Sequence, residues 1–224
     1  MSSTFSQPEQ RSKLGIFAWI LHQFFQLLYH QLAWAYDLIA WIVSLGKWKG
    51  WVLSIIPYLH GSTILELGHG PGHLQIALNQ AGKHCFGLDQ SKQMSAQALR
   101  RLKRNGCPIY LMCASSEQLP LPTNSIPQIV ATFPSEYISS RNTLAEIYRV
   151  LHPGSSAVIL LLAWITGKSI LERLAAWLFR VTGETPEWKD QYLDPARAAG
   201  FIAQSDLIKL PTSKLLIIRL RKPD

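Results

Sequence analysis

The sequence predicts an α/β fold built on a seven-stranded, mostly parallel sheet, with an N-terminal helical cap and a C-terminal antiparallel hairpin. After Pro57, short apolar runs alternate with helical patterns, which is typical of βα units. A glycine-rich turn follows the first of these runs, whereas the first sixty residues are apolar and rich in tryptophan. A chain of 224 residues fits one domain with a smaller subdomain, at about 100–200 residues per domain.

The composition excludes two classes of protein. With 48% hydrophobic and 16% charged residues, the chain is too apolar to be intrinsically disordered. Its three cysteines, Cys85, Cys107 and Cys113, are too few for a disulfide scaffold and show no CxxC spacing. We therefore expect buried, reduced thiols and no metal site. The formal net charge of +8 favours a polyanionic partner, either nucleic acid or an anionic membrane surface.

Residues 1–12 are expected to be a disordered tail, and residues 13–60 an apolar helical cap. Between Lys13 and Lys47 the only charged residue is Asp37, and five of the eight tryptophans lie in the first 51 residues. No stretch reaches the ~20 apolar residues of a membrane span, and we expect no signal peptide. The polar residues of this segment share about one third of a helix circumference; they are His22, Gln23, Gln26, His30, Asp37 and Ser44.

Two interpretations of this polar stripe stay open. The cap helices could pack on a core and expose the stripe to solvent. Alternatively, they could enter a bilayer surface and turn the stripe toward a site. The second interpretation is supported by the tryptophans and by the flanking basic residues Arg11, Lys13, Lys47 and Lys49, which suit an interfacial helix.

Residues 61–224 carry the alternating pattern. Strands are predicted at 62–67, 83–89, 108–113, 127–133 and 156–163, and helices at 72–81, 91–104 and 140–151. A helical insert near 168–181 and a short helix ending at Gly200 follow. Two closing strands near 201–209 and 214–221, joined by a turn at 211–213, predict an antiparallel hairpin at a sheet edge.

The motif with the clearest chemistry follows the first strand: Glu66-Leu-Gly68-His-Gly70-Pro-Gly72-His73. Glycines in a strand-to-helix turn let a ligand approach the backbone, and the next helix presents free N–H groups. The spacing G-x-G-x-G differs from the dinucleotide fingerprint G-x-G-x-x-G, which disfavours NAD. Asp89 ends the second strand, 21 residues after Gly68, where a carboxylate can accept both hydroxyls of a ribose.

Five segments, in order, carry a resemblance to a known family: ILELGHGPGHL, GLDQSKQM, SSEQLPLP, ATFPSEYI and EIYRVLHPG. They resemble the motifs of class I S-adenosylmethionine-dependent methyltransferases, above all the small-molecule branch that includes the ubiquinone and menaquinone methyltransferases. The resemblance covers about residues 60–163. It implies a Rossmann-like fold, S-adenosylmethionine as the cofactor and residues 61–224 as the cofactor-binding domain.

The resemblance also implies residue roles. Glu66 would reach the methionine amino group, and Gly68, Gly70 and Gly72 would form the loop beneath the methionine and ribose. Asp89 would hold the ribose hydroxyls. The remaining cofactor contacts implied are Gln90 and Met94 beside the adenine, Ser115, Ser116 and Glu117 at its edge, Phe133 near the reactive methyl, and Tyr36 covering the cofactor.

Two positions depart from the family pattern. Ser115 stands where relatives commonly have an aspartate at the adenine edge, so it offers a hydrogen bond without a charge. Pro127 stands at the start of the fourth strand, where a proline is expected only as the strand's first residue.

The predicted activity is methyl transfer by in-line displacement to a hydrophobic small molecule such as a quinol, a lipid or a phenol. Orientation of the acceptor can supply ~7–11 kcal/mol, so no catalytic residue is required by the chemistry and none is assigned. The candidates for a general base are His22, His30, Asp37, Glu136 and Tyr137, whereas His69 and His73 fit loop or cap positions.

Two alternative functions are kept. The net charge and the basic run at 99–104 favour a nucleic-acid methyltransferase, although Phe133-Pro-Ser-Glu136-Tyr137 replaces the Asn/Asp-Pro-Pro-Tyr of amino-directed enzymes. The third possibility is a non-enzymatic, membrane-associated module that keeps the cofactor fold. An anionic membrane surface is the second expected partner, with a cytoplasmic location at the inner membrane face, and nothing in the sequence indicates an oligomeric state.

Overall fold

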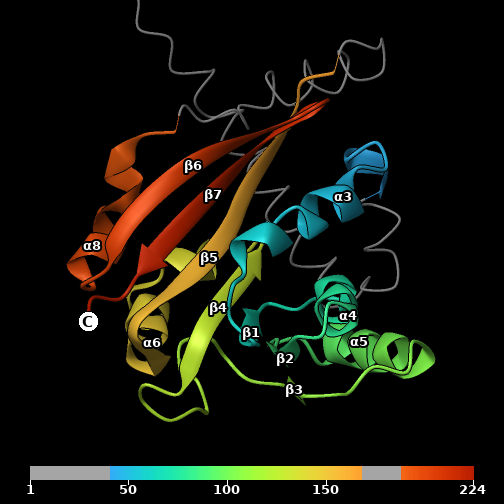
Figure 1. Ribbon diagram of the computed structural model, residues 1–224, viewed down its shortest axis with the longest axis horizontal. Coiled ribbons are helices and arrows are strands. Elements are labelled where there is room, and N and C mark those ends of the chain that lie inside the picture. Colours follow the sequence, from blue (N-terminus) through green and yellow to red (C-terminus); the bar gives the residue numbers. More distant parts are fainter. Residues whose placement is uncertain (1–40, 168–187) are drawn as a thin grey trace, which may run out of the picture.

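The computed structural model describes residues 41–167 and 188–224. One seven-stranded sheet with the strand order β3-β2-β1-β4-β5-β7-β6 forms the centre of the molecule (Figure 1). Strands β1 to β5 are parallel to one another, and β7 runs antiparallel to both β5 and β6. The strands are β1 (Thr63–Leu67), β2 (His84–Leu88), β3 (Leu111–Met112), β4 (Ile126–Thr132), β5 (Leu151–Ile165), β6 (Ile202–Leu210) and β7 (Ser213–Arg221).

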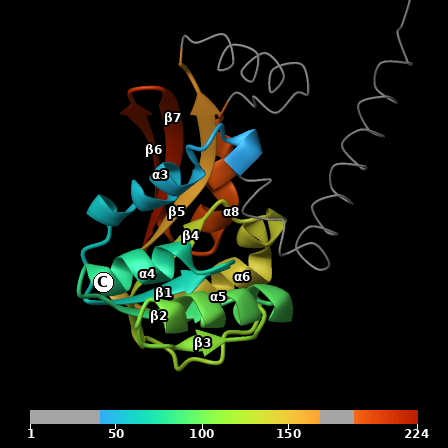
Figure 2. The same cartoon turned by 90° about the vertical axis from the view of Figure 1, so that its right-hand side faces the viewer.

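Helices cover both faces of this sheet (Figures 1 and 2). Helices α3 (Trp48–Leu53) and α4 (His73–Gln80) pack on one face, with α5 (Lys92–Arg104) beside α4, while α6 (Arg141–Val150) and α8 (Asp194–Ala198) pack on the other. The described residues also form three short 3-10 helices: η2 (Ile56–Tyr58), η3 (Glu136–Ser139) and η4 (Asp190–Leu193). The predicted α/β fold with a mostly parallel sheet and a C-terminal hairpin is confirmed.

The parallel strands are buried on both faces, as their continuous apolar sequences require. In β1, Ile64 belongs to the core beneath α3 and α4, whereas Leu65 and Leu67 belong to the core beneath α6 and α8. Glu66 shares the face of Ile64 and is only 1% exposed. A buried carboxyl group inside a central strand is costly, which marks this position for a role other than packing.

Strand boundaries differ from the prediction where the ladder is irregular. β5 begins at Leu151 and ends at Ile165, longer than the predicted 156–163, and β3 is only Leu111–Met112. The prediction for Pro127 is wrong: it is the second residue of β4, at a register shift between Ile126 and Gln128. A bulge needs no N–H at the extra residue, so it accepts proline.

The described part of the cap is anchored to the C-terminal hairpin. The indole Nε1 of Trp51 donates a buried hydrogen bond of 2.9 Å to Ser213 Oγ, and Lys47 Nζ donates one of 2.9 Å to Thr212 Oγ1. Residues 1–12, residues 13–40 of the predicted cap and the predicted insert near 168–181 lie outside the described residues. Among the described helices, none is long and apolar enough to cross a membrane.

The C-terminus is fastened by Lys222, which is 8% exposed. Its ammonium group donates to Asn124 Oδ1 at 2.7 Å and to the carbonyl oxygens of Tyr148 at 2.8 Å and Leu151 at 2.9 Å. A cation at the end of α6 is favoured there by the helix dipole. Lys222 therefore joins the last residues of the chain to the turn between α6 and β5.

The cysteines only partly follow the prediction. All three are free thiols, but Cys85 alone is buried, whereas Cys107 is half-buried and Cys113 is exposed. The expectation of buried thiols is therefore wrong for Cys113, because the segment after the short strand β3 runs along the surface.

Candidate functional site

The glycine loop between β1 and α4 has a backbone that other residues rarely adopt. Gly68, Gly70 and Gly72 have φ values of +70°, +51° and +84°. A Cβ on Gly72 would lie 3.1 Å from the Cβ of Ala98, so this glycine lets α4 and α5 pack closely. A Cβ on Gly70 would meet no atom within 4 Å. The loop thus presents bare backbone to open space at Gly70, as a site for a bound ligand requires.

Asp89 directly follows β2 and faces this loop. Its Oδ2 accepts a hydrogen bond of 2.9 Å from the backbone N–H of Gly70, and its Oδ1 accepts one of 2.8 Å from the N–H of Ser91. The carboxylate is half-buried. Since each carboxylate oxygen has two lone pairs, both keep capacity for a hydroxyl donor. The two bonds fix the orientation of the carboxylate without exhausting it.

A buried polar cluster lies beneath the loop. Gln75 Nε2 donates to Glu66 Oε2 at 2.7 Å and to Cys85 Sγ at 3.0 Å. Burial raises the pKa of Glu66 to about 8, against the smaller opposing effect of the bond from Gln75. Burial likewise raises the pKa of the Cys85 thiol. Both groups are therefore protonated at neutral pH, unless a cation enters and favours the carboxylate.

His69 belongs to the same loop and has one unsatisfied nitrogen. Its ring is 3% exposed, and Nδ1 lies 2.8 Å from the carbonyl oxygen of Gly70. Burial lowers the pKa of His69, so the ring is neutral and Nδ1–H is the donor. Nε2 is then a buried acceptor, and it has no hydrogen-bond partner. His69 is one of the residues that line a cleft beside the glycine loop.

The cleft has a volume of about 30 Å³ and is bordered on one side by α3. It is lined by Trp48, Val52, Glu66, Gly68, His69, Gly70, Pro71, His73, Leu74 and Thr132. The ring of Trp48 lies 4.3 Å from that of Phe133, centroid to centroid, at an interplanar angle of 30°. Phe133 follows β4 and has a φ of +48°, a strained value for a bulky residue and one that is common near functional sites.

Tyr137 covers the other side of the loop. Its hydroxyl donates to the carbonyl oxygen of Leu67 at 3.2 Å, and a Cβ on Gly68 would lie 2.5 Å from Tyr137 Oη. The sequence singled out Tyr137 only as a candidate base, and Trp48 not at all. Their positions depend on contacts between distant segments, for which the sequence offers no local signal.

Of the predicted adenine contacts, Ser116 and Glu117 have side chains that bond to the start of α6, whereas Gln90, Met94 and Ser115 do not. Gln90 is exposed, and its carbonyl accepts from Cys113 Sγ at 3.7 Å, whereas Met94 is 0% exposed within α5. Ser115 Oγ accepts from the N–H of Glu117 at 3.2 Å. The structure turns the next two side chains toward α6: Ser116 Oγ lies 3.1 Å from Thr143 Oγ1, and Glu117 Oε1 accepts from Ser140 Oγ at 2.5 Å.

Of the candidate bases, only two are described. Glu136 is exposed at the start of η3, and Tyr137 lies over the glycine loop. His73 Nε2 lies 2.9 Å from Arg101 Nη1, and His73 is the first residue of α4, whose N-cap is Gly72. The candidates His22, His30 and Asp37, and the cofactor contact Tyr36, lie outside the described residues. No group of three metal-binding side chains occurs in residues 41–167 and 188–224.

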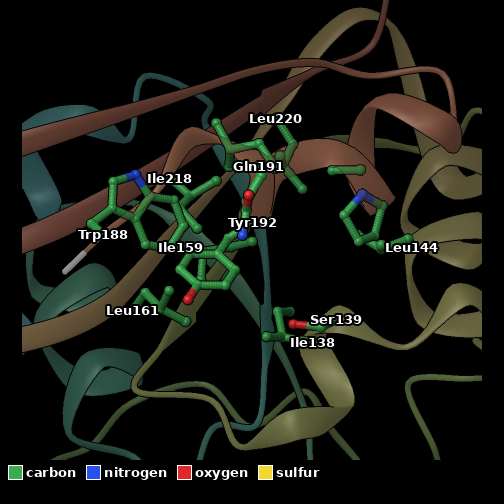
Figure 3. A pocket seen from close by; sticks show the side chains of 13 residues that line it. Ile138, Ser139, Leu144, Ile159, Leu161, Trp188, Gln191, Tyr192, Ile218 and Leu220 are labelled. Atoms are coloured by element: carbon green, nitrogen blue, oxygen red, sulfur yellow. The ribbon is translucent and has the colours of Figure 1, made fainter. Parts of the chain in front are cut away.

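A second, larger cavity of about 330 Å³ lies on the sheet face that carries α6 and α8 (Figure 3). Apolar side chains of β5, β7, η3, η4 and α8 point into it. They include Ile138, Leu144, Ile159, Leu161, Trp188, Tyr192, Leu193, Ala196, Ile218 and Leu220, with Ser139, Gln191 and Pro195. Trp188 is held by a bond of 2.9 Å from its Nε1 to Ser205 Oγ.

The 3-10 helix η3 connects the surroundings of the two cavities, which lie on opposite faces of the sheet. Tyr137 covers the glycine loop, and the next two residues, Ile138 and Ser139, line the apolar cavity. Both follow β4 at the carboxyl edge of the sheet, where ligands of open α/β sheets bind.

Comparisons with known proteins agree with this arrangement. Residues 64–154 match the family described as a methyltransferase domain. The chain is 31% identical over 114 residues to an uncharacterized methyltransferase YdaC of Bacillus subtilis, covering 49% of this chain and 61% of that protein. It is 27% identical over 139 residues to a demethylmenaquinone methyltransferase of Thermus thermophilus, covering 59% and 63%. The chain thus spans about three fifths of the length of these curated relatives.

Solved structures share the fold. A putative S-adenosylmethionine-dependent methyltransferase of Methanococcus maripaludis superposes with a TM-score of 0.61 at 19% identity, covering 100% of this chain and 98% of that one. The phosphoethanolamine N-methyltransferase 2 of Haemonchus contortus, solved with S-adenosylmethionine, gives 0.56 at 15% identity, covering 80% and 53%. The resemblance to class I S-adenosylmethionine-dependent methyltransferases is confirmed.

Proposed function

We propose that this chain, whose residues 64–154 form a methyltransferase domain, transfers a methyl group from S-adenosylmethionine to an apolar small molecule. The observation that carries the proposal is the pairing of the open backbone at Gly70 with the oriented carboxylate of Asp89, 2.9 Å apart. This arrangement suits a ligand that has both a ribose and a charged amino-acid end.

The residues present fit this cofactor. Asp89 would accept the ribose hydroxyls with the lone pairs that Gly70 and Ser91 leave unused. Glu66 would face the ammonium group of the methionine end, where a cation favours its ionised form over the protonated form that burial favours. The unpartnered Nε2 of His69 would accept a hydrogen bond in the same cleft.

The apolar cavity supports an apolar acceptor. Its volume of about 330 Å³ lies at the lower end of the range of about 300–1,000 Å³ that is usual for small-molecule sites. Few of its lining residues are polar, namely Ser139, Gln191 and the hydroxyl of Tyr192. Such a lining favours a ring system or an alkyl chain with one or two polar substituents, as in a quinol, a phenol or a lipid.

The mechanism requires the protein mainly to orient the acceptor toward the methyl group and to exclude water. The sulfonium of the bound cofactor supplies an already activated methyl group. The chain's own residues would orient the acceptor and exclude water, which can account for ~7–11 kcal/mol of the barrier. Trp48 and Phe133 would close the cleft on one side and Tyr137 on the other. Glu136 and Tyr137, which follow β4, would be the groups available to an acceptor that must lose a proton.

Calorimetry with S-adenosylhomocysteine tests cofactor binding, and methyl-labelled S-adenosylmethionine incubated with a lipid extract tests transfer. We expect saturable binding and a labelled apolar product. Absence of binding would refute the proposal. Binding without label in any lipid or quinone fraction would favour a non-enzymatic module instead.

The structure gives no comparable support for a nucleic-acid substrate. Within the basic end of α5, Arg101 donates to the carbonyl oxygen of Pro71 at 2.9 Å and lies against His73. This part of the basic run therefore supports the glycine loop. Association with a membrane surface remains a proposal, and the described residues point to where it would occur.

A further inference from the structure

Three segments that are distant in sequence meet at one end of the molecule (Figures 1 and 2). They are the turn at 41–47 before α3, the turn at 211–212 between β6 and β7, and the end of β5. Lys47 Nζ bonds to Thr212 Oγ1 at 2.9 Å, and the N–H of Thr166 bonds to the carbonyl oxygen of Thr212 at 2.9 Å. We call this region the hairpin end.

The hairpin end exposes large apolar side chains. Trp41 is 61% exposed and Ile42 is 55% exposed, and Val43 and Leu45 are exposed as well. Leu45 and Gly46 have φ values of +51° and +77°, which reverse the chain sharply. Ser44, 1% exposed, points inward and accepts a bond of 2.9 Å from the N–H of Trp48. The turn thus keeps these apolar side chains exposed, while Ser44 and Lys47 hold the turn to α3 and to the β6–β7 hairpin.

The charges around this apolar group have one sign. Lys47, Lys49, Lys209 and Lys214 lie in the adjoining segments, and residues 41–60, 160–167 and 207–216 contain no aspartate or glutamate. Lys209 and Lys214 are both exposed and lie directly opposite one another across the hairpin. Like charges opposite one another destabilise a sheet, and an external anion relieves that cost.

We propose that the hairpin end docks on the surface of an anionic bilayer. Trp41, Ile42 and Leu45 would enter the headgroup boundary, and the lysines would contact anionic headgroups. Exposed apolar side chains and lysines at the same end of the molecule suit this occupant better than nucleic acid, which would leave the apolar side chains unmatched. The proposal goes beyond methyl transfer, because it concerns where the reaction takes place: Trp48, which lines the cofactor cleft, immediately follows Lys47.

Sedimentation of the full chain with vesicles tests the proposal. One set contains phosphatidylcholine and phosphatidylglycerol at 7:3, and the other contains phosphatidylcholine alone. We expect binding to the anionic vesicles that weakens with salt. Lys209→Gln with Lys214→Gln should weaken it roughly thirtyfold, at about 1 kcal/mol per lysine. Trp41→Ser with Ile42→Ser should weaken it on both kinds of vesicle.

The basic helix α5 supplies a matched control. Lys103 and Arg104 are exposed at its end, near the exposed Ile109 and Tyr110. Replacing both with glutamine removes the same charge at a site away from the hairpin end (Figure 1). Binding should therefore change by less than about twofold if the hairpin end docks. Loss of binding in the α5 variant but not in the hairpin variants would overturn the proposal, as would absence of binding to anionic vesicles at low salt.

S-adenosylhomocysteine binding separates this proposal from the proposed activity. Each variant should bind the product as the unchanged chain does, because no substituted residue lines the cofactor cleft. If the Trp41→Ser, Ile42→Ser variant loses both vesicle and product binding, it has misfolded. The docking proposal is then tested by the Lys209→Gln, Lys214→Gln variant. A chain that binds vesicles through the hairpin end but binds no cofactor would refute the activity and leave the docking surface standing.

Discussion

The Oδ2 of Asp89 and the backbone N–H of Gly70 are joined by a hydrogen bond of 2.9 Å, across the gap between the ends of β2 and β1. Gly70 is also the loop residue around which a Cβ would find only open space. The carboxylate therefore sets the position of the loop and borders the space that a ligand would fill. Asp89 is the residue on which the cofactor proposal depends most directly.

Replacing Asp89 with alanine should lower the affinity for S-adenosylhomocysteine roughly tenfold to hundredfold, since hydrogen bonds to a charged group contribute about 1.5–3 kcal/mol. Calorimetry measures this change. Asp206→Ala is the matched control, because Asp206 pairs with Arg219 at 2.7 Å on the exposed hairpin, away from the cleft. Equal affinity in both variants would show that Asp89 does not hold the ligand.

Replacing Gly68 with alanine should reduce cofactor binding through contact as well as strain. The residue has a φ of +70°, and the added Cβ would lie 2.5 Å from Tyr137 Oη. Gly82→Ala isolates the strain, because Gly82 has a φ of +73° with nothing within 4 Å. We expect both variants to lose about 1–2 kcal/mol of folding free energy in denaturant titrations, but only Gly68→Ala to lose cofactor binding.

Adding Tyr137→Phe to Gly68→Ala tests whether contact with the Tyr137 hydroxyl causes the loss of cofactor binding. This change removes the hydroxyl that the new Cβ would meet, so the double variant should recover part of the lost affinity. If it recovers none, the strained backbone of the loop, and not Tyr137, limits this position.

The cavity beside η3 leads to a third prediction. Ala196 is 6% exposed and lines the cavity from α8. Ala196→Leu should reduce transfer to an apolar acceptor at least about tenfold, because the added side chain occupies the space of the acceptor, while product binding stays unchanged. Ala198→Leu, at an exposed position of the same helix, is the control. Transfer that is equal in the two variants would place the acceptor elsewhere.

Much of the sheet was predictable because its strands are short apolar runs bounded by turns. The predicted limits of β1, β2 and β4 agree with the structure within one residue. The register shifts at Ile126/Gln128 and Leu160/Leu162 were not predictable, because a bulge depends on the partner strand. Pro127 was the one local signal, and it is the second residue of the strand, not the first as predicted.

In the candidate site, too, some residues could be placed from the sequence and others could not. The placement of Glu66, the glycines and Asp89 was predictable, because Glu66 lies near the carboxyl end of β1 and the glycines and Asp89 follow the ends of the adjacent parallel strands β1 and β2, which meet at one edge. The contact of Tyr137 with Leu67 joins residues 70 positions apart and could not be predicted. Nor could the rotation of Ser116 and Glu117 toward α6, since it depends on the partners Thr143 and Ser140.

Lys222 should contribute strongly to stability. Lys222→Met would leave the carbonyl oxygens of Tyr148 and Leu151 without their ammonium donor. We expect a loss of about 2–4 kcal/mol in the free energy of unfolding, measured by denaturant titration. Lys189→Met, at an exposed position, should change it by less than about 0.5 kcal/mol. A Lys222→Met variant as stable as the unchanged chain would mean that the C-terminal contacts do not limit folding.

The buried carboxyl group of Glu66 should make stability and cofactor binding depend on pH in opposite directions. Burial raises the pKa of Glu66 from an ordinary value of 4.5 to about 8. Between these values the folded chain keeps a proton that the unfolded chain has lost, so its contribution is fully present below the ordinary pKa and is lost as pH rises toward 8. Glu66→Gln should therefore flatten the decline, and the variant should exceed the unchanged chain in melting temperature most clearly near pH 8.

Product affinity should instead increase across the same pH range, because the ammonium group proposed to lie at Glu66 is attracted to the ionised carboxylate. Calorimetry in buffers of different ionisation enthalpy would detect up to one proton released on binding at pH 7, and Glu66→Gln should abolish that release. Glu146→Gln is the control, because Arg149 lowers the pKa of Glu146 and that group stays ionised throughout. A proton release that persists in Glu66→Gln would assign the titration to another group.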